Sequence, residues 1–114
     1  MRDAVVYWVP KAPHRRRRGR TDTVFLILLD YVAPLAEIDR LLPEHRAYLE
    51  RNYDAGRFLM SGPREPRTGG VILATANDRA ELVAVVETDP FVTSQAATYE
   101  IVEFTPTRSE VSRV

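Results

Sequence analysis

The sequence contains no cysteine and carries no net charge, and only two of its 114 residues are histidines. The absence of cysteine excludes disulfide bridges, thiolate metal ligands and a cysteine nucleophile. No apolar run approaches the roughly 20 residues that span a bilayer. The first apolar stretch precedes the basic residues near the N-terminus, which is the reverse of a secretory signal. We therefore expect a cytoplasmic protein that has no contact with a membrane.

A chain of this length corresponds to one domain, and an apolar share of 45% is ordinary for a globular protein. Basic residues are unevenly distributed, because five arginines crowd one short stretch: Arg15, Arg16, Arg17, Arg18 and Arg20. Clustered like charges resist compact folding. We therefore expect residues 1–22 to be a flexible extension, residues 23–108 to form the domain and residues 109–114 to be a tail.

Four segments have the composition of β-strands. They are residues 23–29 (continuing to near Tyr31), 57–61, 71–75 and 99–104. The first and third are unbroken apolar runs, which is typical of strands buried on both faces, whereas the fourth alternates apolar and acidic residues. Residues 64–70 are polar and contain a Gly-Gly pair, so we expect them to connect the second and third strands as a hairpin.

The segment between the first two strands is helical but contains Pro43. A proline inside a helix removes one hydrogen bond and clashes with the preceding turn, whereas the first position of a helix accepts it. The sequence therefore predicts a short turn over residues 35–42 and a separate main helix over residues 43–55. Gly56 then provides the left-handed residue at which the helix ends.

The resulting order is βαββαβ, the split βαβ pattern of a ferredoxin-like α+β domain. Right-handed crossovers place both helices on one face of a four-stranded antiparallel sheet, with the first and third strands in the centre. The first strand is apolar on its other face too, and a large exposed apolar sheet is a recognition surface. We therefore expect a second copy to cover that face, which gives a homodimer through the sheet.

His45 is the only histidine inside the predicted domain, because His14 belongs to the arginine-rich extension. Leu41, Tyr48 and Leu49 surround it at helical spacings, so its side chain should point toward the sheet. This position suits either a core histidine bonded to a carbonyl or a functional imidazole.

Asp89 is the second unusual position. Asn77 or Asp78 can cap the second helix, whose apolar stripe runs through Val86. The helix ends by Asp89, because a residue before proline avoids helical geometry. Asp89 continues this buried stripe, and a buried carboxylate needs a partner. It is either a turn residue at the helix exit or a partner of His45 across the shared face of the sheet.

If the two residues meet, the carboxylate would fix the imidazole tautomer and leave the other nitrogen to act as base and then acid. Ser61 and the backbone of Gly62 and Pro63 could bind a substrate oxygen, and Tyr48 is a further candidate for substrate binding. One histidine and one aspartate are too few ligands for a metal site. We expect neither a metal nor a cofactor.

Several segments in order resemble the YCII-related family. They are PEHRAYL at 43–49, GRFLMSGP at 56–63, Gly70 and DPF at 89–91, and the likeness spans roughly residues 24–105. The resemblance implies a dimeric α+β barrel whose characteristic histidine and aspartate correspond to His45 and Asp89. It also implies relatives such as a dehydrochlorinase of a chlorinated hydroxyquinol, and muconolactone isomerase is similar in fold.

The sequence therefore favours a small cofactor-independent lyase, isomerase or dehydrochlorinase that acts on a small oxygenated, cyclic or aromatic compound. The alternative is an accessory protein that binds a small ligand without turnover. A haem or flavin enzyme of similar fold is not favoured, because the sequence has no second embedded histidine and no glycine-rich phosphate loop. Nucleic-acid binding is weakly supported, because the central strands offer one aromatic residue, Phe25, and only residues 15–20 could contact phosphates.

Overall fold

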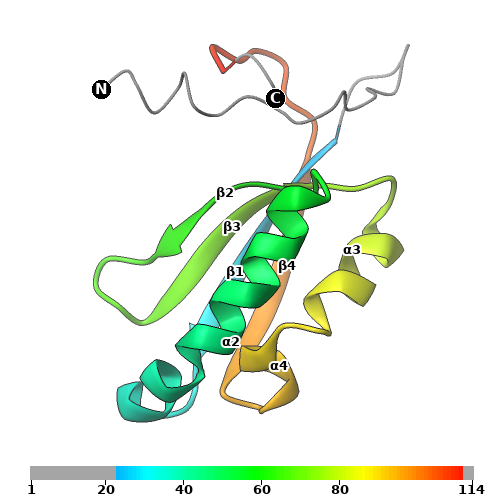
Figure 1. Cartoon of the computed structure of the whole chain (residues 1–114). Coiled ribbons are helices and arrows are strands. Elements are labelled where there is room, and N and C mark those ends of the chain that lie inside the picture. Colours follow the sequence, from blue (N-terminus) through cyan, green and yellow to red (C-terminus); the bar gives the residue numbers. More distant parts are fainter. Residues whose placement is uncertain (1–22, 112–114) are drawn as a thin grey trace.

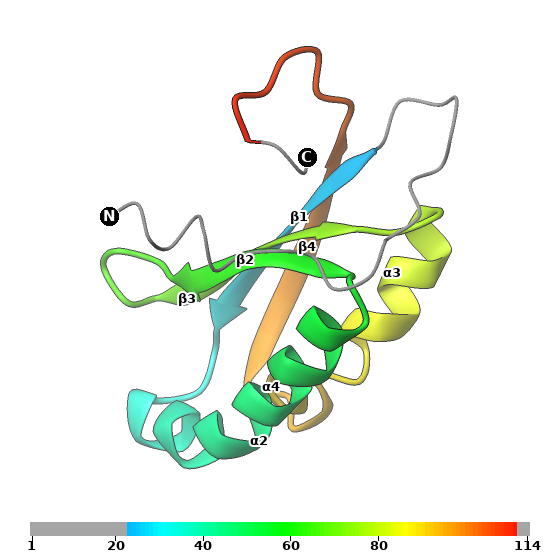
Figure 2. The same cartoon turned by 45° about the horizontal axis from the view of Figure 1, so that its top comes forward.

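Four strands form one antiparallel sheet in the order β2-β3-β1-β4, and three helices lie on one face of it in the computed structural model (Figures 1 and 2). The strands are β1 (Val24–Tyr31), β2 (Phe58–Pro63), β3 (Gly69–Thr75) and β4 (Ala97–Phe104). The helices are α2 (Leu35–Asp54), α3 (Arg79–Val86) and α4 (Pro90–Thr93). The predicted ferredoxin-like α+β class is confirmed, with the first and third strands in the centre of the sheet.

The structure describes residues 23–111. The predictions for residues 1–22, including the arginine cluster, and for the last three residues of the tail lie outside this range. Residues 105–111 follow β4 without a helix or strand. No helix within the described range is long and apolar enough to cross a membrane.

Helix α2 differs from its prediction, because it continues through Pro43 as one helix. A proline inside a helix costs about 3 kcal/mol. Ile38 and Leu41 before the proline, and His45 and Tyr48 after it, are all buried, and each large apolar side chain that leaves water contributes roughly 1.5–3 kcal/mol. Packing on both sides of Pro43 therefore outweighs the lost hydrogen bond, and the helix changes direction in its first half (Figures 1 and 2).

The second predicted helix is also different, because it ends at Val86 and a separate short helix, α4, follows. Asp78 is the N-cap of α3, and its carboxylate accepts a hydrogen bond from the amide of Glu81. Glu81 in turn accepts from the amide of Asn77 at 2.8 Å, which completes a reciprocal cap. The aspartate expected at the end of α3 caps the start of α4 instead.

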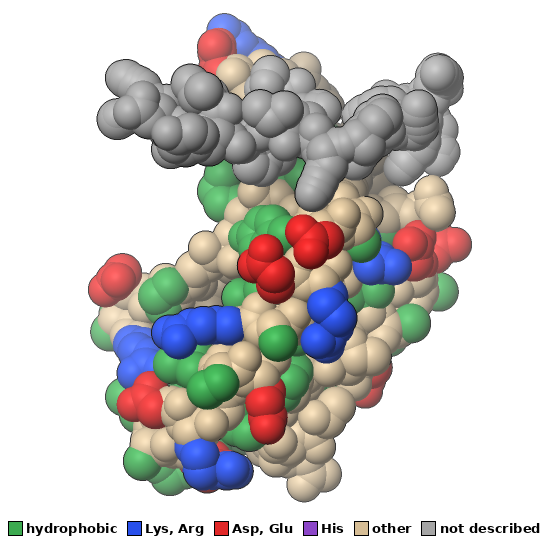
Figure 3. Space-filling model, viewed as in Figure 1, with side chains coloured by type: hydrophobic (Ala, Val, Ile, Leu, Met, Phe, Trp, Pro, Cys, Tyr) green, Lys and Arg blue, Asp and Glu red, His purple; other side chains and the backbone are tan. Residues whose placement is uncertain are grey.

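Alternation along β1 separates two apolar faces. Phe25, Ile27 and Leu29 are buried in the core between sheet and helices, so their neighbours point to the opposite face. That face carries apolar side chains that are half-buried or exposed: Leu26, Leu28, Met60, Leu73 and Val102. On the helix side, by contrast, charges of both signs are interspersed (Figure 3). The homodimer through the open sheet face stays a prediction.

Gly69 stands where β3 passes very close to β1. A Cβ atom added at Gly69 would lie 1.8 Å from the carbonyl oxygen of Leu29, whereas one added at Gly62 would meet nothing within 4 Å. The predicted hairpin glycine thus belongs to β3, where it permits the close approach of the two central strands.

We expect the protein to be a dimer. A charged side chain introduced on the open sheet face should dissociate it. Leu73→Glu should give the mass of one chain by light scattering at micromolar concentration, because a carboxylate at a buried apolar contact is unpaired. The wild-type protein and the matched variant Ala47→Glu, on the exposed side of α2, should both give twice that mass. A wild-type protein that is a stable monomer would contradict the prediction.

Gly69→Ala should lower the free energy of unfolding by about 2–4 kcal/mol, because the β1 backbone must move to admit the methyl group. Gly62→Ala is the matched control and should stay within about 0.5 kcal/mol of wild type. Denaturant unfolding of the three proteins measures the difference. Equal midpoints for Gly69→Ala and wild type would show that the strands do not approach so closely.

Candidate functional site

His45 lies in the middle of α2 with its side chain directed into the protein. It is only 8% exposed, and its Nδ1 atom lies 2.8 Å from Oδ1 of Asp89. The two residues are 44 positions apart in the sequence, and they meet because α2 packs against α4. The structure therefore brings together the histidine and the aspartate that the sequence analysis singled out.

Asp89 is fully buried and precedes Pro90, the first residue of α4. Its backbone is extended, which suits a residue before proline. Oδ1 accepts a second hydrogen bond from the amide of Phe91 at 2.9 Å. The Asp-Pro-Phe segment thus fixes the carboxylate by its own backbone, and the carboxylate in turn fixes the imidazole.

Two aromatic rings hold the plane of the imidazole. Phe91 stacks on His45 with ring centroids 4.0 Å apart and planes 11° from parallel. Tyr31, at the end of β1, contacts Phe91 edge-on at 5.7 Å. The ring of His45 is therefore restrained on one face by stacking and at Nδ1 by the carboxylate.

Two buried oxygen atoms near this pair have no hydrogen-bond partner within residues 23–111: Asp89 Oδ2 and the hydroxyl of Tyr48. Burial, and next the negative charge of Asp89, raise the pKa of Tyr48 above its usual value. The phenol therefore stays protonated at neutral pH. Both hydrogen bonds of the Asp89 carboxylate are therefore on Oδ1, and one of them joins His45.

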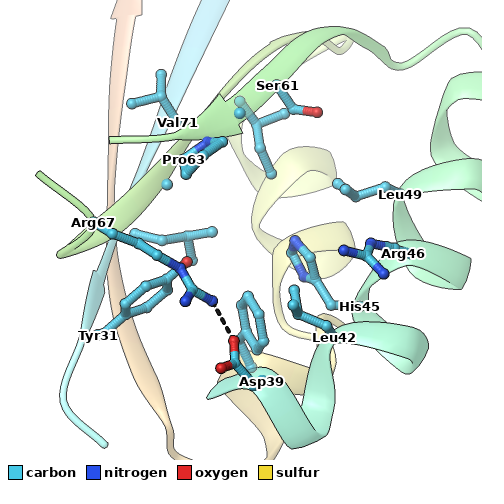
Figure 4. A pocket seen from close by; sticks show the side chains of 15 residues that line it. Tyr31, Asp39, Leu42, His45, Arg46, Leu49, Ser61, Pro63, Arg67 and Val71 are labelled. Carbon is cyan, nitrogen blue, oxygen red and sulfur yellow. Dashed lines mark hydrogen bonds and ion pairs between the residues drawn. The ribbon is translucent and has the colours of Figure 1, made fainter. Parts of the chain in front are cut away.

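A cavity of about 430 Å³ opens in front of His45 (Figure 4). Helix α2 forms one wall, and β2, β3 and the connection between them form the other. The apolar part of its lining includes Leu29, Leu42, Leu49, Pro63, Ile72 and Phe91. His45 borders this space, and its Nε2 atom makes no hydrogen bond to any part of the chain that the structure describes. Nε2 is thus available to a bound molecule.

The other candidates from the sequence lie in different places. Ser61, Gly62 and Pro63 line the cavity opposite His45, and the hydroxyl of Ser61 is 2.7 Å from that of Tyr53 on α2. Asp89 lies behind His45 and does not border the cavity. Tyr48 is fully buried in the core and does not line it either, so a contact of Tyr48 with substrate stays a prediction.

Three charged residues at the cavity were not singled out from the sequence: Asp39, Arg46 and Arg67. Arg67, from the connection between β2 and β3, donates to Asp39 of α2 at 2.6 Å (Figure 4). In the sequence each of them looks like an ordinary charged surface residue. Only the fold shows that they border the same cavity as His45. The helical spacing of three between Asp39 and Leu42 was the available signal, since Leu42 lies on the same side of α2 as the cavity.

No three side chains of His, Asp or Glu come together as a metal site within residues 23–111. The hydrogen-bonded pair of His45 and Asp89 leaves one imidazole nitrogen without a partner, and the hydroxyl of Ser61 lies on the opposite part of the lining. The arrangement can therefore move a proton to or from a bound molecule.

A model of the YCII-related domain matches residues 23–105. The chain belongs to the YCII-related family. No curated protein matches the sequence at a significant level. The family assignment agrees with the fold, and it covers every residue that lines the cavity.

Two solved proteins align with the chain, one of them with a TM-score above 0.5. The 5-chloro-2-hydroxyhydroquinone dehydrochlorinase of Burkholderia phenoliruptrix AC1100, in complex with 2,5-dihydroxybenzoquinone, aligns with a TM-score of 0.61 and 20% identity over 76% of this chain and 96% of its own. SnoaB, a cofactor-independent oxygenase of Streptomyces nogalater, aligns with a TM-score of 0.46 and 16% identity over 80% of this chain and 98% of its own. The likeness to the dehydrochlorinase is one of fold.

Proposed function

We propose that this protein is a small cofactor-independent enzyme in which His45 transfers protons and Asp89 positions it. The substrate is a small oxygenated compound, cyclic or aromatic. One observation carries the proposal: Nδ1 of His45 is bound by a buried carboxylate, while the residue borders a cavity of about 430 Å³ and Nε2 has no hydrogen-bond partner within residues 23–111. A carboxylate that accepts from Nδ1–H leaves the lone pair on Nε2 and raises its basicity.

Proton transfer at Nε2 accounts for both an elimination and an isomerisation. Nε2 takes a proton from an acidic C–H or O–H group, and the electrons of that bond move into the substrate. In an elimination they expel an anion from a neighbouring carbon, and in an isomerisation the new imidazolium returns the proton to a different carbon. Asp89 stabilises the imidazolium without taking its proton.

The surroundings of His45 support a ring-shaped substrate. The cavity volume lies within the range of small-molecule sites, and its lining is mainly apolar with a few polar groups. The hydroxyl of Ser61, which Tyr53 orients, can bind a substrate oxygen across from His45. A neighbour of the same fold is named for removing chlorine from a hydroxylated ring, and this reaction class requires the same type of proton transfer.

The second candidate is a binding protein that holds a similar ligand without turnover. The mainly apolar lining favours it, because such a lining can hold a ring-shaped ligand without a chemical step. A panel of hydroquinones, hydroxybenzoates and unsaturated lactones separates the two candidates. Ligands that raise the melting temperature but are unchanged by NMR after incubation would indicate a binding protein.

For a compound that is turned over, His45→Gln should lower kcat/KM by roughly 10²–10⁴-fold, the usual contribution of a general acid or base. Asp89→Asn should lower kcat more than it raises KM, because it removes the charge that stabilises the imidazolium while it leaves the cavity lining unchanged. Steady-state kinetics on both variants measures these effects.

His14→Gln is the matched control, since it removes the other histidine of the chain, and it should retain full activity. Circular dichroism should show native folding for all three variants. A folded His45→Gln variant with wild-type kcat/KM would refute the role of His45.

A further inference from the structure

The cavity beside His45 has one positive charge that no described residue compensates. Its charged lining residues are Asp39, Arg46 and Arg67. Arg67 and Asp39 form an ion pair at 2.6 Å, and their hydrogen bond raises the pKa of Arg67. These two charges balance each other. Arg46 has neither a hydrogen bond nor an ion pair within residues 23–111.

The absence of a partner for Arg46 is informative because its own helix offers one. Glu50 lies four residues further on, at a spacing that pairs charges on a helix surface, yet the two side chains form no ion pair. The side chain of Arg46 instead borders the cavity next to His45 (Figure 4). A guanidinium presents a planar fork of donors that matches a carboxylate with two parallel hydrogen bonds.

We infer that Arg46 binds the carboxylate of the substrate, which makes the substrate a small ring compound with a carboxylate group. This inference rests on the proposed function, because it takes the cavity at His45 as the binding site. Arg46 is exposed and His45 is buried, so the carboxylate lies at the mouth of the cavity and the ring lies further in.

The apolar lining agrees with this orientation. Leu42 and Leu49 flank His45 on α2, and Ile72 faces them from β3, so the inner part of the cavity suits the faces of a ring. A carboxylate in that inner part would lose its hydration among apolar side chains. At the mouth it keeps contact with water and gains the charge-assisted bonds of Arg46. The carbon atom that reacts is then directed toward Nε2 of His45.

Arg46 also matters for the chemistry at His45. Removal of a proton from the ring by Nε2 leaves additional negative charge on the substrate. The guanidinium that binds the carboxylate attracts this charge electrostatically. Arg46 is thus a residue that determines substrate specificity, and it contributes to the stability of the anion that forms.

Benzoate and benzamide test the inference, because they have almost the same shape and differ in charge. Titrations followed by protein NMR should show that wild type binds benzoate at least about tenfold more tightly than benzamide, a ratio that corresponds to one charge-assisted pair. Arg46→Gln should bind both compounds with the same affinity, close to that of benzamide for wild type. Arg51→Gln is the matched control, since Arg51 is exposed on the same helix but does not line the cavity, and it should keep the preference for benzoate.

Equal affinity of wild type for the two probes, or a preference that persists in Arg46→Gln, would overturn the inference. Failure of benzoate to bind wild type would overturn it as well. The proposed function is tested separately, because a loss of turnover in His45→Gln does not depend on how the carboxylate is bound. If that loss is observed while Arg46→Gln keeps the preference for benzoate, only the role of Arg46 is wrong.

Discussion

The hydrogen bond between Nδ1 of His45 and Oδ1 of Asp89 is the interaction on which the site depends. A buried carboxylate without a partner is costly, and Asp89 is fully buried. Its two hydrogen-bond partners, the imidazole of His45 and the amide of Phe91, come from α2 and α4. The pair therefore stabilises the packing of these helices and also determines which nitrogen of His45 is left for a ligand.

The rest of the site follows from the position of this pair. Phe91 must follow Asp89 closely to donate its amide, and the same residue stacks on the imidazole. The sheet supplies the opposite wall, because β2 and β3 lie across from α2 and carry Ser61 and Ile72. The polar side chains are arranged in order of depth, with Asp89 fully buried, His45 at the cavity and Arg46 exposed at its mouth.

The sheet could be predicted from the sequence because burial on both faces leaves unbroken apolar runs, as in residues 23–29 and 71–75. The predicted break of the helix at Pro43 was wrong. The local preference of proline favoured two separate helices, but packing on both sides of Pro43 stabilises one continuous helix. Helix α4 was missed because its four residues are too few to show a period. Periodicity directed His45 inward, whereas Arg46 could not be recognised, because an exposed arginine next to a histidine looks the same whether it contacts solvent or borders a cavity.

The tautomer of His45 tests the central claim most directly. Long-range ¹H–¹⁵N correlation spectra distinguish the two nitrogens of a neutral imidazole, and His14→Gln removes the only other histidine signal. Donation from Nδ1 to Asp89 predicts that Nδ1 carries the proton and that Nε2 is unprotonated. The signal should lose this preference in Asp89→Ala. A neutral His45 that carries its proton on Nε2 in the wild-type protein would contradict the account, because the nitrogen that borders the cavity could not then act as a base.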